Sequence, residues 1–154
     1  MRNALFSLPE WQRAKRVFIY VSVDPEPDTR RIIDCALREG KQVAVPKVYG
    51  MGRMLAHCIS DLALLRPGAM GILEPPEQSP VMEKPDLIVL PCLACDRSNN
   101  RLGHGGGYYD RYLSSHPCFS ICLCPDECLF ESIPHDDNDV RPDMILTQSK
   151  NLTK

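Results

Sequence analysis

The sequence lacks long apolar runs, internal repeats, low-complexity segments and a strong excess of charge of either sign. It has no apolar stretch near the roughly 20 residues of a membrane-spanning helix and no recognisable secretion signal, so we expect a cytoplasmic protein without a membrane partner. A formal net charge of −2 argues against a broad surface for nucleic acid. These absences exclude whole classes of protein and leave an ordinary enzyme or binding domain.

The composition fits such a domain. Of the 154 residues, 44% are hydrophobic and 25% are charged, proportions typical of a soluble globule. A chain of this length buries about two thirds of its unfolded surface when it folds. We therefore predict one domain over residues 1–154.

Cysteine is the unusual component, with eight residues: Cys35, Cys58, Cys92, Cys95, Cys118, Cys122, Cys124 and Cys128. Without a secretion signal a disulfide framework is disfavoured. Cys92-Leu-Ala-Cys95 has the spacing of zinc ligands or of a redox pair, but the interval from Cys122 to Cys124 is wrong for the common zinc ribbons. On a strand those two thiols would share one face, where buried cysteine packs as a small hydrophobic residue. We favour buried free thiols over a metal-binding module.

Short apolar runs predict buried strands at residues 16–23, 42–45, 54–59, 86–90, 120–124 and 144–147. Pro46 is expected to end the second strand, and residues 149–154 are expected to be frayed. Helices are predicted over residues 8–14, where Ser7 and Glu10 have capping-box spacing, and from about residue 28 to 39, closed by Gly40. The alternation predicts an α/β fold: a three-layer, mostly parallel, Rossmann-like sheet with helices on both faces. Ligands of such sheets bind beyond the carboxyl ends of the strands.

The most informative stretch is a glycine loop at residues 103–107, Gly-His-Gly-Gly-Gly, which we expect to follow directly on the strand at 86–90 and to precede a helix that starts near Tyr108. Glycine lets backbone N–H groups approach a ligand, and the first N–H groups of a helix favour an anion. Arg101 suits a phosphate, and Asp110 suits a hard divalent cation. The loop lacks the endings of a P-loop or a dinucleotide fingerprint, so spacing alone leaves a simple flexible turn open.

Arg101-Leu-Gly-His-Gly-Gly-Gly-Tyr-Tyr-Asp-Arg111, preceded by Leu90-Pro91 and Asp96, resembles the signature of the 5-formyltetrahydrofolate cyclo-ligase family, the methenyltetrahydrofolate synthetases. The resemblance extends through residues 20–29, 40–46, 71–75 and 133–143. It implies an ATP- and magnesium-dependent enzyme that cyclises 5-formyltetrahydrofolate to 5,10-methenyltetrahydrofolate and releases ADP and phosphate. The expected partners are ATP as co-substrate, Mg²⁺ as cofactor and the folate; the expected state is a monomer or weak dimer.

The resemblance also implies roles for individual residues. Those expected at the nucleotide are Arg101, Leu102, Gly103, His104, Gly105, Gly106, Gly107, Tyr108 and Tyr109. Those expected at the folate are Val21, Glu26, His104, Gly105, Gly106, Gly107 and Tyr108. Asp110 and Asp143 would hold magnesium, and the catalytic residues would be Arg101, His104 and Tyr108.

Other interpretations of these residues stay open. Asp110 could simply complement the helix dipole, and Glu26 and Asp143 could be solvated turn residues. The family's usual first helix, whose Lys and Arg reach the ATP phosphates, has no aligned counterpart in Arg2, Arg13, Lys15 and Arg16. The second hypothesis is therefore a shortened relative that binds folate or nucleotide with little or no turnover. Asn99 stands where the family usually has Gly, and Asn is the best substitute in a left-handed turn.

Overall fold

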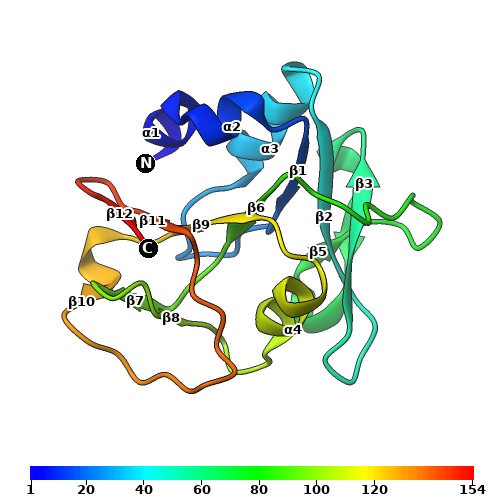
Figure 1. The fold of residues 1–154 in the computed structure, drawn as a ribbon. Helices are drawn as coiled ribbons and strands as arrows, with labels where there is room; N and C mark the ends of the chain where they lie inside the picture. The colour runs from blue at the N-terminus through cyan, green and yellow to red at the C-terminus, as the bar shows by residue number, and fades with distance from the viewer.

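The structure, a computed structural model, describes all residues from 1 to 154 and is built on one twisted sheet with helices on both sides (Figure 1). The order of the strands is β12-β11-β9-β6-β1-β2-β3. Their bounds are β1 Arg16–Ile19, β2 Gln42–Val48, β3 Met54–Ile59, β6 Leu87–Leu90, β9 Phe119–Leu123, β11 Met144–Leu146 and β12 Asn151–Thr153. The five strands from β11 to β2 are parallel, and the two edge strands are antiparallel. The predicted mostly parallel α/β fold is confirmed.

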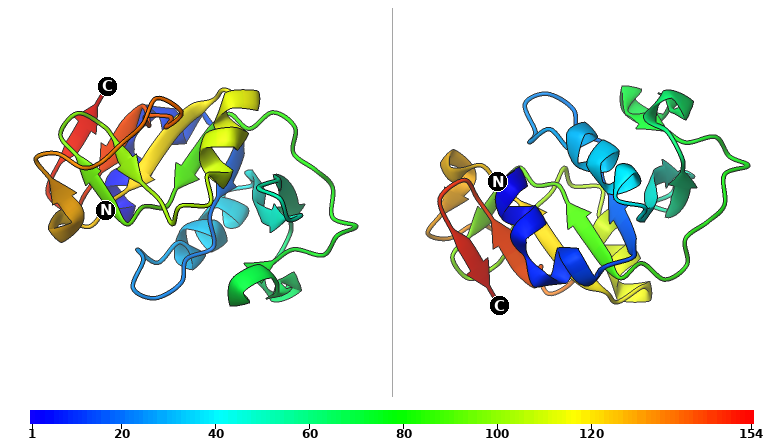
Figure 2. Two further views of the ribbon diagram at one scale, coloured as in Figure 1. Left: turned by 90° about the horizontal axis from the view of Figure 1, so that it is seen from below. Right: turned by 90° about the horizontal axis from the view of Figure 1, so that it is seen from above.

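The helices divide between the two faces of this sheet. Figure 2 shows α1 Arg2–Ser7, α2 Pro9–Arg13 and α3 Arg30–Arg38 on one side, and α4 Tyr108–Ser115 on the other. No helix has the length and apolar character that crossing a bilayer requires. The helices on both sides of the sheet confirm the predicted three-layer arrangement.

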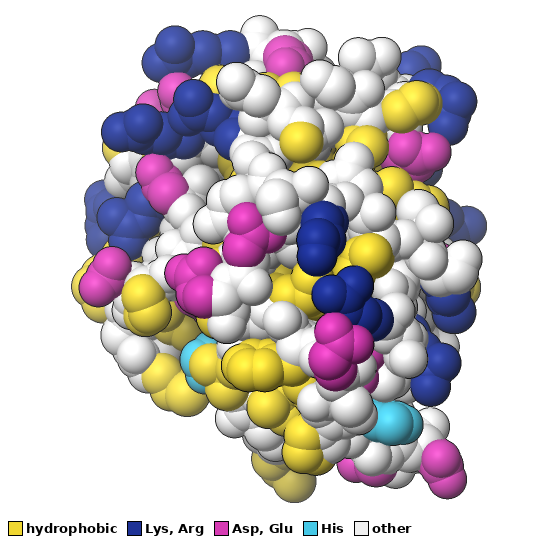
Figure 3. Space-filling view, turned by 90° about the vertical axis from the view of Figure 1, so that its left-hand side faces the viewer, with side chains coloured by type: hydrophobic (Ala, Val, Ile, Leu, Met, Phe, Trp, Pro, Cys, Tyr) yellow, Lys and Arg dark blue, Asp and Glu magenta, His cyan; other side chains and the backbone are white.

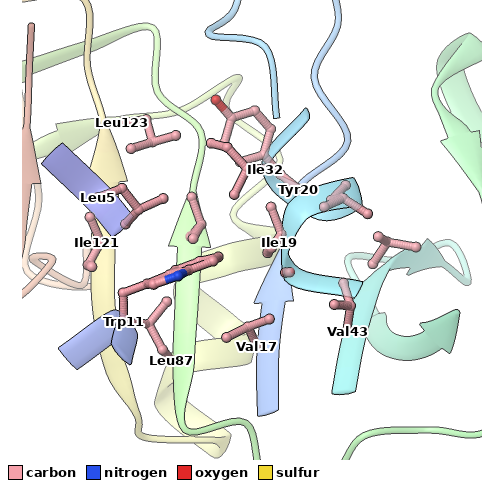
Figure 4. Close-up of a cluster of buried hydrophobic side chains, with 14 of the residues drawn as sticks. Leu5, Trp11, Val17, Ile19, Tyr20, Ile32, Val43, Leu87, Ile121 and Leu123 are labelled. Carbon is pink, nitrogen blue, oxygen red and sulfur yellow. The ribbon is translucent and has the colours of Figure 1, made fainter. Parts of the chain in front are cut away.

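Two separate buried clusters lie against the two faces. Val17 and Ile19 of β1 belong to the cluster under α1–α3, whereas Phe18 between them belongs to the cluster under α4. The alternation follows from the strand geometry, in which successive side chains point to opposite faces. In Figure 4, Leu5 and Trp11 lie over the strand residues of the first cluster. A strand buried on both faces needs the nearly continuous apolar sequence that these strands have.

Short elements complete the fold. β7 Ala94–Asp96, β8 Arg101–Leu102 and β10 Leu129–Phe130 form a small sheet, and β4 Arg66–Pro67 pairs with β5 Leu73–Glu74. Single 3₁₀ turns occur at η1 Leu62–Leu64, η2 Ala69–Gly71 and η3 Asp126–Cys128. Because the β7–β8 hairpin lies between β6 and the glycine loop, the predicted direct passage from strand to loop is wrong.

Three local predictions are also wrong. Ser7 is the last residue of α1, so it does not cap α2, whose N-cap is Leu8. β2 continues through Pro46. Because β1 pairs with β2 only as far as Ala44, the N–H that proline lacks is not needed for a hydrogen bond to β1. The C-terminal residues are not frayed, since β12 pairs with β11.

The surface carries charges of both signs. On the face drawn in Figure 3, basic and acidic side chains are interspersed with neutral ones, and apolar side chains gather in the lower half. This distribution agrees with the small net charge of the sequence.

Candidate functional site

The glycine loop at residues 103–107 connects β8 to α4, on the face opposite α1–α3. Gly105 and Gly107 have φ of +83° and +63°, values that other residues rarely adopt. A Cβ on Gly107 would also lie 2.7 Å from Nη1 of Arg111. Gly107 is the N-cap of α4 and no side chain caps the helix, so its first N–H groups are available to an anion.

Arg111, which the sequence analysis did not assign to the site, braces this loop. Its Nε donates to the carbonyl of Gly52 at 3.0 Å and its Nη2 donates to the carbonyl of Gly106. The guanidinium also lies 5.6 Å from the centre of the Tyr108 ring. The loop is thereby tied to the turn between β2 and β3, a contact that no local sequence pattern indicates.

Arg101 and Asp110 form a bidentate pair. Nη2 of Arg101 donates to both carboxylate oxygens of Asp110, at 3.1 and 3.0 Å, and Nη1 donates to the carbonyl of Pro91 at 3.3 Å. The Arg101 side chain is 3% exposed, and its Nε is buried without an acceptor. The residue expected at a phosphate and the residue expected at magnesium therefore hold each other.

The β7–β8 turn that presents Arg101 is organised by Asp96. Its carboxylate accepts N–H bonds from Ser98, Asn100 and Ile133 at 2.9 to 3.1 Å. Burial acts to raise the pKa of Asp96, but these bonds outweigh it and hold the pKa below the ordinary value. Asn99, between these donors, has φ of +61°, which confirms the left-handed conformation predicted for it.

Glu26 and His104, far apart in the sequence, come together beside the loop. Nε2 of His104 lies 3.5 Å from Oε1 of Glu26, while Oε2 of Glu26 accepts from the backbone N–H of Val23 at 2.9 Å. Glu26 is 12% exposed and His104 is 60% exposed at their side chains. The structure thus brings the predicted folate residue against the predicted nucleotide loop.

The segment that carries Glu26 is held by a buried hydroxyl network. Thr29 Oγ1 donates to the carbonyl of Tyr20 at 2.6 Å and accepts from the N–H of Ser22 at 2.9 Å. The N–H of Thr29 donates to Ser22 Oγ at 3.1 Å. These bonds replace a regular ladder beyond Ile19, which explains why β1 ends before the predicted Val23.

Val21 is buried and Tyr109 is half-buried, and both are packed against the core. Val21 is 4% exposed and belongs to the cluster under α1–α3. Tyr109 stacks on Phe18 with ring centres 6.4 Å apart, and burial raises the pKa of its hydroxyl. Their contacts with folate or nucleotide stay predictions.

Asp143 has its own partner. Its Oδ2 accepts from the N–H and the hydroxyl of Ser120, both at 2.9 Å, at the start of β11. Asp110 instead accepts from Arg101 and, at 3.0 Å, from the N–H of Val140. The described contacts do not join the two carboxylates, so their action as a magnesium pair stays a prediction.

Comparison with known proteins shows to which family the chain belongs. The model of the 5-formyltetrahydrofolate cyclo-ligase family matches residues 1–148. The chain belongs to this family. A probable 5-formyltetrahydrofolate cyclo-ligase of Schizosaccharomyces pombe is 34% identical, with 93% of this chain and 79% of that protein covered. The cyclo-ligase of Mus musculus is 30% identical, with 89% and 75% covered.

A solved cyclo-ligase relative has the same fold. The 5,10-methenyltetrahydrofolate synthetase of Aquifex aeolicus superimposes with a TM-score of 0.87 at 30% identity. The superposition covers 99% of this chain and 78% of that one. The resemblance identified from the glycine-loop signature is therefore confirmed over nearly the whole chain.

Proposed function

We propose that this cyclo-ligase closes 5-formyltetrahydrofolate to 5,10-methenyltetrahydrofolate with cleavage of ATP to ADP and phosphate. The observation that carries the proposal is the contact between Glu26 and His104, which joins a carboxylate suited to a pterin with a loop suited to phosphates. Family membership supplies the reaction class.

The reaction needs a better leaving group than a formyl oxygen. The γ-phosphoryl group moves from ATP to that oxygen, and ADP leaves. N10 of the folate then bonds to the formyl carbon and loses its proton to solvent, the carbon–oxygen bond breaks, and phosphate departs. Phosphoryl transfer depends mainly on positioning and on neutralising phosphate charge.

The loop backbone supplies most of that positioning in our proposal. N–H groups of residues 103–108, at the positive end of α4, would contact the ATP phosphates. Exposed His104 and half-buried Tyr108 would lie between nucleotide and folate. The described contacts of Glu26 Oε1 are limited to His104, so this oxygen can accept an N–H of the reduced pterin.

Arg101 takes a different part from the one its sequence position suggests. Its burial and its bonds to Pro91 and Asp110 make it a support for the base of the loop. We propose that its positive charge stabilises the phosphates electrostatically, without a direct contact. Arg111, exposed and already bound to Gly106, is the better placed cation for a direct contact.

Asp110 and Asp143 have donor chemistry that suits Mg²⁺. A carboxylate has about four acceptor positions, and the described contacts of Asp110 use three. Oδ1 of Asp143 has no described partner. We propose these two residues as the magnesium ligands; the ion would neutralise negative charge on the ATP phosphates.

The direct test is product formation. Incubation with Mg²⁺, ATP and 5-formyltetrahydrofolate should give equal amounts of ADP and methenyl absorbance, and omission of ATP should give neither. Folate binding without product would contradict the proposed activity and favour the shortened, non-catalytic relative.

A Glu26→Gln substitution tests where the folate binds. Loss of one charge-assisted hydrogen bond should raise the KM for folate by about tenfold or more, while the KM for ATP changes little. Asp28→Asn, in the exposed segment just before α3, is the matched control. The reverse order of the two KM changes would show that the pterin lies elsewhere.

A further inference from the structure

Four of the eight cysteines converge where β6 and β9 leave the sheet. Cys92 follows β6, Cys95 lies on β7, Cys122 lies on β9 and Cys124 follows β9. All four are buried, and none forms a disulfide. Sequence analysis favoured buried free thiols, and the arrangement of the strands has gathered these into one group.

The sulfur atoms are close enough to share a ligand. The Sγ atoms of Cys92, Cys95 and Cys122 all lie within 4.8 Å of one another, and those of Cys95 and Cys122 are 3.5 Å apart. Cys124 lies two residues after Cys122 and is also buried, so it is the candidate for a fourth thiol, although its Sγ lies outside this group of three. Four thiolates at about 2.3 Å from a tetrahedral zinc ion would be roughly 3.8 Å apart. The 3.5 Å between Cys95 and Cys122 is close to that value.

The composition of the cluster selects a soft metal. It holds no described carboxylate or imidazole, which excludes the hard-donor sites that Mg²⁺ and Ca²⁺ prefer. Thiolates favour zinc and other soft ions. Separations this short suit one ion better than a cluster of several metal atoms.

The surroundings offer a compensating charge. Zinc with four thiolates has a formal charge of −2, which is costly in a buried place without a cation nearby. Buried Arg101 is the register partner of Cys95, and its Nε has no acceptor of its own. A metal–thiolate group would add a second negative group near this guanidinium, whose Nη2 already pairs with Asp110.

We propose that Cys92, Cys95 and Cys122, with Cys124 turning in as the fourth ligand, form a structural site for one Zn²⁺ ion. Each thiol gives up its proton to solvent when its sulfur binds the metal. Two hydrogen bonds are then lost, from Cys92 Sγ to the Leu123 carbonyl and from Cys124 Sγ to the Pro125 carbonyl, both at 3.4 Å.

The site would fix the base of the glycine loop. Cys95 is the register partner of Arg101 across β7 and β8, so an ion that joins β7 to β9 also fixes the strand carrying Arg101. The metal thus has a positioning role beside the cyclo-ligase site, with no part in the bond changes.

Metal content tests the proposal directly. The full chain, purified under reducing conditions and loaded with zinc alone, should retain about one equivalent after desalting. Loading with Co²⁺ should give intense sulfur-to-cobalt absorption, which reports thiolate ligation without any need for turnover. The double variant Cys95→Ser/Cys122→Ser should lose both, whereas Cys35→Ser, on α3 and outside the cluster, should keep both.

Two results would overturn the proposal. One is wild-type protein that keeps less than about a tenth of an equivalent of zinc and shows no thiolate–cobalt absorption. The other is equal metal retention by the double variant. If the double variant does not fold, the cobalt spectrum of the wild type still decides the question. The metal readout is independent of cyclo-ligase activity, so failure of either proposal can be told from failure of the other.

Discussion

The two faces of the central sheet are lined by the same strands but have different chemistry. Under α1–α3 the buried cluster is almost purely apolar and encloses Trp11. Under α4 the cluster includes buried thiols and adjoins the Arg101–Asp110 pair. Because alternate residues of each strand face opposite layers, one face can provide apolar stability while the other holds polar groups near a site.

The difference has an energetic reason. Burial of apolar side chains stabilises the fold roughly in proportion to area. A buried ion pair adds little net stability, but removal of one partner leaves an unpaired charge that is strongly destabilising. Apart from Val21, substitutions in the α1–α3 cluster should therefore affect stability alone, and substitutions on the α4 face should affect stability and activity together.

Asp110→Ala should have the largest combined effect. It leaves buried Arg101 without its carboxylate, which should lower the free energy of unfolding by about 3–5 kcal/mol and, by displacing the loop, turnover by about 100-fold. Denaturant unfolding and single-turnover kinetics measure the two losses. Asp34→Ala, which removes an exposed pair with Arg38 on α3, should cost only about 0.3–0.5 kcal/mol. Similar losses of stability and turnover in the two variants would contradict the proposed difference between the two faces of the sheet.

Trp11→Ala should be nearly as destabilising but leave the chemistry intact. The indole is 1% exposed, and truncation of a buried Trp costs about 3–5 kcal/mol. Thermal unfolding should show the loss, while kcat at a temperature well below the transition should be unchanged. A fall in kcat of folded protein would mean that the apolar face also positions the site.

Gly107→Ala and Gly40→Ala form a matched pair. Both glycines have left-handed φ, so each substitution should cost about 1–2 kcal/mol in backbone strain. A Cβ at Gly40 meets open space, whereas one at Gly107 displaces Arg111. Only Gly107→Ala should therefore raise the KM for ATP. Equal KM values for the two variants would remove the α4 N-terminus from the nucleotide site.

The smallest effect is expected from pH. Because the folded pKa of Asp96 is below the ordinary 3.8, its carboxylate stabilises the fold above that value, and the contribution is lost as pH falls through the folded pKa. Asp96→Asn should thus have a lower free energy of unfolding than wild type at pH 7, and the difference between the two proteins should become smaller below about pH 4. Denaturant unfolding curves at several pH values measure this difference in stability. A difference that does not change with pH would mean that the substitution acts through altered hydrogen-bond geometry and not through the lost charge.

Local patterns foresaw much of this molecule. The apolar runs located β1, β3, β6, β9 and β11, and Gly40 ends α3 with the left-handed φ expected of it. The prediction failed where a distant partner decides: Pro46 stays in β2 because of how β1 and β3 pair with it. The pairing of Arg101 with Asp110 was also missed, because Arg101 by itself suits a phosphate and Asp110 by itself suits a divalent cation.

By itself, the sequence determined the α/β order, the glycine loop and the cyclo-ligase family, since all three depend on residues close together in the chain. Only the tertiary structure decided that Glu26 meets His104, that Arg111 reaches Gly52, and that thiols from two strands share one place. The physical reason is register: which distant side chains touch depends on how the strands align, and no stretch of sequence contains that alignment.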